Sequence, residues 1–366
     1  MAPETKQTRD GSLIKFIAYM QIIGIVLVVL GHSFHEYPDG DHGMSTLLYR
    51  MMYSFRMPTF MFVSGFLMVY TTHIRRDNPP GVGDFCRSKV KRLLLPFLVL
   101  SLVTFVPRAM MTGMADDDLS MSFGSLCRSL LYSGDMVIPY FWFLQASFIL
   151  LTVNYCIIYF AEKRGVTRWK TYSVLLAIAL LLPASSFSDF FSVNSAVRLS
   201  VYFILGSAYS HYSARVDRFI KWDSIWMLLA CGAVWSVSFL LFEGSGWMMI
   251  CSIAGICMCM SLARILESRH IGVLDHLIGA NYIIFLLSWY FNVATQQVLG
   301  AFVSLPWWIH TLMSLTAGIY VPYLFYRYMQ SHPDSRAVRI SAYLLGQSLR
   351  NKRPENRSGV CIAAGK

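Results

Sequence analysis

Long apolar segments separated by short polar gaps dominate this chain. A membrane-spanning helix needs about 20 mostly apolar residues, and segments of that kind recur from residue 13 to residue 327. They lie at 13–35, 46–71, 92–112, 139–161, 171–187, 195–212, 223–242, 246–264, 279–300 and 306–327. The pattern predicts an all-α protein, a polytopic transmembrane helical bundle of about ten helices.

The positions of the charged residues predict which side of the membrane each gap faces. If the N-terminus is cytoplasmic, all but five of the 31 lysines and arginines fall in segments that this topology places inside. The outer gaps hold acidic residues instead: Glu36, Asp39, Asp41, Asp116, Asp117, Asp118, Asp135, Asp189 and Glu243. Such an excess of basic residues marks the cytoplasmic side. We therefore predict two cytoplasmic termini, a transmembrane domain over 1–329 and a basic cytoplasmic tail over 330–366.

Composition excludes a soluble fold. Hydrophobic residues make up 55% of the chain and charged residues 14%, whereas soluble domains carry about 25% charged residues. The net charge of +11 does not indicate a nucleic-acid partner, because the basic residues are spread through short gaps between spans. The eight cysteines show neither metal-type nor disulfide-framework spacing, so we expect no metal site.

One arginine stands out from the five that the topology does not place inside. Arg50, Arg108 and Arg198 lie near helix ends, where long side chains reach water, and Arg128 lies in an outer loop. Arg56 falls inside the second span. A charge within the hydrocarbon is costly and marks a functional site by default. The alternative is a structural ion pair between helices.

His32 is the second candidate, at the end of the first span. His32 and Arg56 are each twelve residues from the centre of the first outer loop, so a helical hairpin would bring them to a similar depth. Glu36 follows His32 by four residues and shares its helix face. We predict that His32 is a general base and that Glu36 orients it. The alternative is an interfacial histidine in contact with lipid headgroups.

A basic run begins the third span. Arg87, Lys89, Lys91 and Arg92 lie within six positions at a predicted cytoplasmic helix start. Guanidinium and ammonium groups in such a cluster could hold the phosphates of a nucleotide-type ligand. Anchoring to anionic lipid is the alternative.

Several short motifs follow one another in a fixed order between about residues 20 and 330. They are Gly24-x-x-Leu27-Val28-Val29-Leu30-Gly31-His32-Ser33, Phe55-Arg56-Met57-Pro58-x-Phe60-x-Phe62-Val63-Ser64-Gly65-Phe66-Leu67, Lys89-x-x-Arg92-x-x-x-Pro96-Phe97, Trp142-Phe143-Leu144, Phe203-Ile204-Leu205-Gly206 and Ile278-Gly279-x-x-Tyr282-x-Ile284-x-Leu286-Leu287. With these motifs and the predicted spans, the chain resembles the membrane-bound acyltransferase type 3 family, including its fucose-O-acetylase-like branch.

The resemblance implies an enzyme that takes an acyl group, usually acetyl, from cytoplasmic acyl-CoA. The acceptor would be a hydroxyl of a cell-envelope or exported glycan, and the protein would lie in a bacterial inner (cytoplasmic) membrane. His32 matches the histidine that the family uses in acyl transfer. Lys89 and Arg92 match its basic pair near CoA, and we group Arg87 with them as a ligand of acetyl-CoA.

The chain departs from the family pattern at four positions. Gln21 stands where most members carry Arg or Lys, and Ala18 stands where they usually carry an acidic residue. Arg56 stands where this branch often has His, and Ser288 where many relatives have His. Two other functions therefore stay open: a transporter or flippase of lipid-linked glycan, and a non-catalytic assembly partner. We find no internal repeat of the kind that transporter folds show.

Overall fold

The computed structural model describes residues 6–34, 43–74, 79–110, 120–242, 248–269, 272–302 and 306–349. Helices make up most of these ranges, and no strand occurs in them. The α-helices are α1 (Lys6–Ser33), α2 (Gly43–Tyr53), α3 (Arg56–Val69), α4 (Val82–Lys89), α5 (Leu95–Met110), α6 (Phe123–Leu131), α7 (Trp142–Lys163), α8 (Arg168–Leu181), α9 (Val193–Phe219), α10 (Ile225–Phe242), α11 (Met248–Ser268), α12 (Asn281–Phe302), α13 (Trp307–Ser331) and α14 (Arg336–Leu344).

These helices confirm the prediction of an all-α, multi-pass membrane protein. In the described ranges, five helical stretches are long and apolar enough to cross a membrane: Lys15–Ser33, Val82–Met110, Pro139–Lys163, Ile225–Phe242 and Met248–Ser268. Four of the other predicted spans coincide with α8, α9, α12 and α13, and the second predicted span falls on both α2 and α3. The number of spans and the side on which each terminus lies stay predictions.

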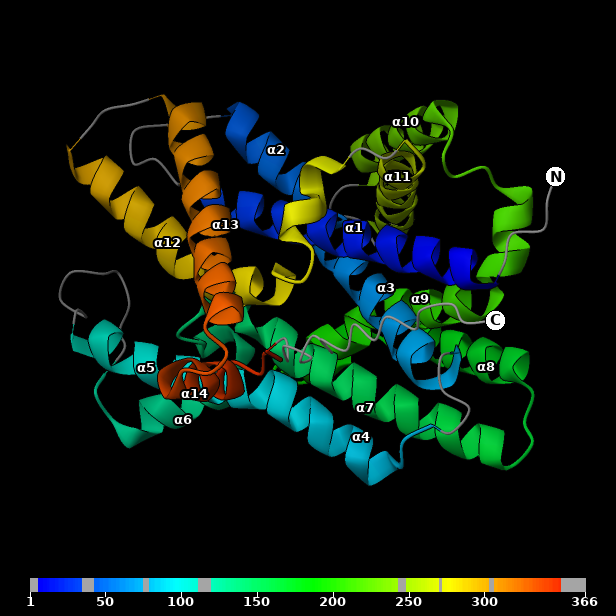
Figure 1. Ribbon diagram of the computed structural model, residues 1–366, viewed down its shortest axis with the longest axis horizontal. Coiled ribbons are helices and arrows are strands. Elements are labelled where there is room, and N and C mark those ends of the chain that lie inside the picture. The colour runs from blue at the N-terminus through cyan, green and yellow to red at the C-terminus, as the bar shows by residue number, and fades with distance from the viewer. Residues whose placement is uncertain are drawn as a thin grey trace, which may run out of the picture.

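Helix α1 runs through the middle of the bundle (Figure 1) and contacts α3, α11, α12 and α13. Its side chains are buried on several faces, including Phe16, Ile22, Ile25 and Val29. A helix that is hydrophobic all round is expected to be buried. Because α1 is buried on several faces between Phe16 and Ser33, His32 in its last turn has protein on several sides.

The second predicted span is wrong as a single helix. It is divided between α2 and α3 at Ser54 and Phe55, with Arg56 as the first residue of α3. Pro58 explains the break, because proline has no N–H and its ring clashes with the carbonyl four residues earlier, which is that of Ser54. The Ser252 hydroxyl of α11 donates to this carbonyl instead, at 2.6 Å.

The third predicted span starts earlier than expected. Helix α4, a π-helical turn at Val90–Leu94 and α5 follow one another without a gap, so that Val82–Met110 is one long helical stretch. The π-helical turn lies within the basic run. Single π turns inside α-helices are frequent at functional sites.

The start of the predicted tail packs on the bundle. Helix α14 buries Val338 and Ala342, and Leu345 behind it is also buried. Gly346 adopts a positive φ of 62° and lies against the backbone of Arg92. Residues 350–366 of that tail lie outside the described residues, and its boundary at 330 stays a prediction.

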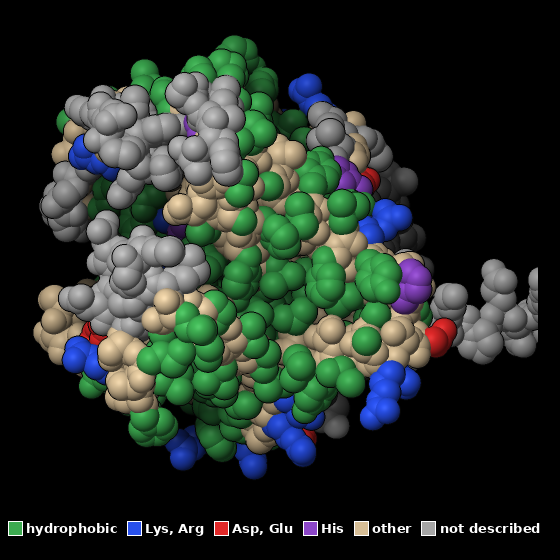
Figure 2. Space-filling model, turned by 90° about the vertical axis from the view of Figure 1, so that its left-hand side faces the viewer, with side chains coloured by type: hydrophobic (Ala, Val, Ile, Leu, Met, Phe, Trp, Pro, Cys, Tyr) green, Lys and Arg blue, Asp and Glu red, His purple; other side chains and the backbone are tan. Residues whose placement is uncertain are grey.

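Lipid-facing surface is visible on the outside of the bundle. Figure 2 shows a face on which most described side chains are hydrophobic, with several lysines and arginines along its lower rim. Large apolar side chains are exposed on α8 and α10, where Leu181 and Leu240 are 81% and 78% accessible. Such an apolar surface is unfavourable in water and favourable against the hydrocarbon core of a bilayer.

Two glycines bring α3 and α9 into backbone contact. A Cβ on Gly65 would meet the carbonyl of Phe203, and a Cβ on Gly206 would meet the carbonyl of Phe62. The Ser207 hydroxyl donates to the Gly65 carbonyl at 3.2 Å. Small residues permit this approach between membrane helices, so the motif that contains Gly65 and the motif that contains Gly206 meet in one structural contact.

We therefore expect Gly206→Ala to destabilise the fold by about 1–3 kcal/mol, the usual range for overpacking. Thermal unfolding of the detergent-solubilised protein, followed by size-exclusion chromatography, measures the effect. Gly232→Ala is the matched control, because a Cβ there meets only the Met258 sulfur at 3.8 Å. Equal melting temperatures for the two variants would contradict the close contact.

Candidate functional site

His32 lies in the last turn of α1, at the end that the predicted topology places outside. Its Nε2 atom is buried and has no hydrogen-bond partner among the described residues. The imidazole faces the ring of Tyr140, with centroids 5.2 Å apart. The Gln296 side chain of α12 donates to the His32 carbonyl at 3.0 Å. The histidine is thus held by its surroundings, while one ring nitrogen stays available.

Arg56 begins α3 and is 3% exposed. Its guanidinium carbon lies 4.8 Å from the ring centre of Tyr53 and 5.4 Å from that of Tyr49, both on α2. Cation–π contacts of this kind stabilise a desolvated arginine. The Nε and Nη1 atoms are buried without a hydrogen-bond partner in the described part of the chain. Two donors of a buried guanidinium therefore stay available beside the aromatic pair.

The structure brings His32 and Arg56 together. The Arg56 guanidinium lies against Gly31, the residue before His32, where any larger residue would put a side chain. The positive charge of Arg56 also interacts electrostatically with the His32 imidazole. The expected similar depth in one hairpin is thus realised by a contact between α1 and the start of α3.

Helices α10 and α11 fix the break that places Arg56. The Trp235 indole donates to the Ser54 hydroxyl at 3.1 Å, and Phe55 packs edge-on against Trp235 with ring centres 5.2 Å apart. Gly255 of α11 makes room for the Phe55 side chain. The start of α3 is therefore held by Trp235 of α10 and by Ser252 and Gly255 of α11.

One predicted feature near His32 is outside the structural description. Glu36, expected to orient the histidine, lies in the segment 35–42, which is not among the described residues. Its role stays a prediction.

The basic run lies away from His32, on the helical stretch Val82–Met110. The Lys89 ammonium is 4.8 Å from the Phe85 ring, and the Arg92 guanidinium is 5.6 Å from the Tyr282 ring. The Tyr282 hydroxyl donates to the Arg92 carbonyl. Arg87 and Arg92 are exposed, while Lys89 is partly buried. Aromatic rings thus lie beside two cations of the run, and Arg87 is exposed.

The residue next to Tyr282 shows how far the basic run lies from His32 along α1. Asn281 donates from its side chain to Gln21 of α1 at 3.1 Å, so the Arg92 region lies near the level of Gln21. Eleven residues separate Gln21 from His32, which corresponds to about 16 Å at 1.5 Å per residue. The basic run and His32 therefore lie at two different levels along α1, and the run is related to α1 through Tyr282 and Asn281.

An ion pair ties the inner part of α1 to the segment before α12. The Lys15 ammonium lies 3.2 Å from Asp275, and the Tyr19 hydroxyl donates to the same carboxylate at 2.5 Å. The hydrogen bond from Tyr19, together with Lys15, lowers the pKa of Asp275. Both contacts are near water, so we assign them a structural part in joining α1 to α12.

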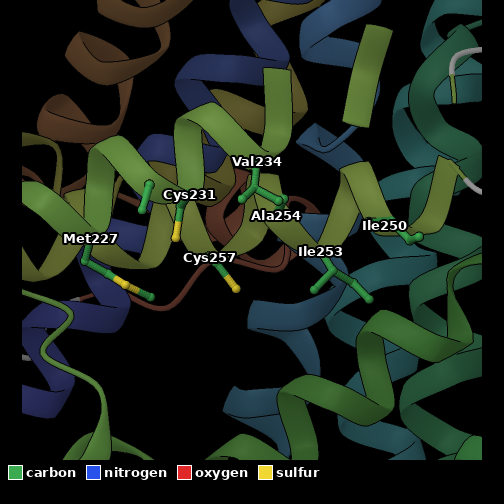
Figure 3. Close-up of a pocket in the computed structure, with 8 residues that line it drawn as sticks. Met227, Cys231, Val234, Ile250, Ile253, Ala254 and Cys257 are labelled. Atoms are coloured by element: carbon green, nitrogen blue, oxygen red, sulfur yellow. The ribbon is translucent and has the colours of Figure 1, made fainter. Parts of the chain in front are cut away.

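An apolar groove lies on another part of the molecule. It has a volume of about 390 Å³ and is lined by Met227, Ala230, Cys231, Val234, Ile250, Ile253, Ala254 and Cys257 of α10 and α11. Figure 3 shows several of these side chains turned toward one open space. With no charged group in its lining, this groove offers no acid, base or anion ligand.

Sequence reasoning missed three residues that surround His32. Tyr140 precedes the Trp142-Phe143-Leu144 motif and packs on the imidazole, while Asn292 and Gln296 of α12 bind the backbone of α1. The four-residue spacing of Ser288, Asn292 and Gln296 was the available signal, because such residues share one helix face. In the described ranges, no group of three or more His, Cys, Asp or Glu side chains could hold a metal.

The fold and the site define a multi-pass membrane protein with a partly buried histidine at one end of its central helix and a buried arginine beside it. A family model described as an acyltransferase domain, that of acyltransferase 3, matches residues 14–327. The chain therefore belongs to the membrane-bound acyltransferase type 3 family and is a membrane acyltransferase. Searches of curated proteins and of solved structures each found no match.

The contact between Gly31 and Arg56 gives a test of the site. In Gly31→Ala the added methyl group would occupy the place of the guanidinium, so Arg56 must leave its position. We expect acyl transfer to fall by about 100-fold, the usual effect of displacing a reacting group by about 1 Å. Activity is measured on protein whose melting temperature matches that of the Gly232→Ala control; normal activity would show that the contact is dispensable.

Proposed function

We propose that this protein is an O-acyltransferase that moves an acyl group, usually acetyl, from cytoplasmic acyl-CoA to a hydroxyl of a cell-envelope or exported glycan. The observation that carries the proposal is a set of buried polar atoms at one place, His32 Nε2 with Arg56 Nε and Nη1, which have no hydrogen-bond partner among the described residues. A buried polar atom without a partner is destabilising by about 1–3 kcal/mol. Substrate groups that bind there would offset that penalty.

His32 is the proposed general base. Its Nε2 accepts the proton of the acceptor hydroxyl, and the oxygen attacks the thioester carbonyl carbon. The carbon–sulfur bond then breaks, and the departing thiolate takes the proton from the imidazolium to give an O-acyl ester and CoA thiol. A relay through an acylated His32 yields the same products. Glu36 is proposed to orient the imidazole.

Arg56 is the proposed stabiliser of the oxyanion. Charge develops on the carbonyl oxygen during attack, and a fixed cation in a water-poor site stabilises it most effectively. Tyr49 and Tyr53 hold the guanidinium in place before the reaction. The Nε and Nη1 atoms are the donors that remain for the oxygen.

The basic run is the proposed site for the CoA phosphates. Lys89 and Arg92 are steadied by aromatic rings, and Arg87 is exposed beside them. Cations in a cluster bind phosphate through charge-assisted hydrogen bonds. The separation of about 16 Å along α1 is one that an extended phosphopantetheine arm spans. A bacterial inner (cytoplasmic) membrane fits this arrangement, with donor inside and glycan acceptor outside.

His32→Ala tests the chemistry. We expect loss of glycan acylation by at least about 100-fold, the contribution typical of a general base, and a comparable loss in Arg56→Met, as for an oxyanion donor. Mass spectrometry of surface glycans from cells that express each variant measures the acyl mass. His332→Ala, on an exposed residue, is the control; full acylation by well-expressed His32→Ala would remove this histidine from the mechanism.

Lys89 and Arg92 test the donor site and separate an acyltransferase from a glycan flippase. We expect Lys89→Met and Arg92→Leu each to weaken binding of labelled acetyl-CoA to the purified protein by about 10-fold, because one charge-assisted bond contributes roughly 1.5 kcal/mol. Lys91→Met, in the same run, should change binding less. Absence of acetyl-CoA binding by the unaltered protein would favour a transporter or a non-catalytic partner.

A further inference from the structure

Three polar side chains lie on one face of α12, near the end of α1 that carries His32. Two of them donate hydrogen bonds to backbone carbonyls of α1. Ser288, Asn292 and Gln296 follow one another at intervals of four residues, which places them on one helix face. Gln297, the next residue, is exposed. We call Ser288, Asn292 and Gln296 the α12 polar row.

Gln296 binds the residue that carries the imidazole. Its Nε2 donates to the His32 carbonyl at 3.0 Å. His32 is the second-last residue of α1, and the last four carbonyls of a helix have no partner within the helix. Gln296 therefore supplies a cap from a neighbouring helix to a carbonyl that is otherwise open.

Asn292 binds α1 one turn earlier. It is 0% exposed, and its Nδ2 donates to the Val29 carbonyl at 3.2 Å, which also accepts the Ser33 hydroxyl at 2.8 Å. Gly318 of α13 lies against the amide oxygen of Asn292 and leaves room for it. Contacts to two carbonyls, one turn apart, fix both the height and the rotation of the last turn of α1.

Helix α12 also contacts the aromatic neighbour of the imidazole. The Tyr140 hydroxyl donates to the Leu286 carbonyl of α12 at 3.4 Å and lies beside Ser288. Tyr140 is buried, with its ring 5.2 Å from that of His32. Helix α12 thus constrains the His32 backbone through Gln296 and Asn292, and the His32 ring through Tyr140.

We propose that the α12 polar row is a positioning device, which holds the His32 imidazole in the orientation that acyl transfer needs. The role rests on the proposed function of His32, whereas the positioning itself is a property of the fold. Residues that orient a reacting group contribute about 10- to 100-fold although they do not touch the substrate.

Gln296→Met is the decisive variant, because methionine keeps the shape of glutamine and removes the donor. We expect kcat to fall about 10-fold while KM for acetyl-CoA stays within about twofold. Gln297→Met is the matched control, with the same change one position further on an exposed face. The reaction of His32 with diethyl pyrocarbonate, followed by mass spectrometry, should become several-fold faster in Gln296→Met alone, since the last turn of α1 loosens.

Gln296→Glu separates positioning from helix packing. An ionised carboxylate cannot donate to the His32 carbonyl, whereas a protonated one can. The deficit in kcat relative to the unaltered protein should therefore shrink as the pH falls, and the deficit of Gln296→Met should not. A role in packing alone would give no such pH dependence.

The outcomes distinguish this inference from the proposed function. Equal His32 reactivity in Gln296→Met and Gln297→Met overturns the positioning role, whatever the activity. Faster reaction with unchanged kcat also overturns it. If the unaltered protein transfers no acyl group, the proposed function fails, and a selective rise in His32 reactivity in Gln296→Met still supports the positioning of His32.

Discussion

The contact between Arg56 and Gly31 is the arrangement on which the site depends. A guanidinium cannot stay in an apolar bundle unless its environment is built around it. Here the α2–α3 break sets Arg56 at a helix start, two tyrosines of α2 cover its planar face, and the missing side chain at Gly31 lets it lie beside His32. The helix break, the two tyrosines and Gly31 each contribute to keeping this charged side chain buried.

The break itself follows from one hydrogen bond that proline cannot make. Pro58 leaves the Ser54 carbonyl without its helical partner, and hydrocarbon offers no water to replace that partner. Ser252 donates to this carbonyl from α11. The position of Arg56 therefore depends on helix packing, because α11 supplies the hydrogen bond to the Ser54 carbonyl that Pro58 removes.

The motifs of the family divide into structural and chemical ones. Gly65 and Gly206 face each other across the α3–α9 contact, where the absence of a side chain matters. Gly31 serves both purposes, because it allows close approach and sets Arg56 beside the candidate base. The motif residues around Lys89 and Arg92 lie on a continuous helix with a π-helical turn, and α14 packs against that region.

The sequence by itself determined the membrane class, the helical segments, the family and the pairing of His32 with Arg56, because hydrophobic length and charge placement are local properties of the chain. Only the tertiary structure revealed the break at Ser54, the aromatic cover of Arg56 and the hydrogen bonds of Asn292 and Gln296 to α1. The hydrogen bonds among these features join residues up to 264 positions apart, and their acceptors are backbone carbonyls, which every residue carries. No pattern in the sequence can single out such partners until the helices are packed.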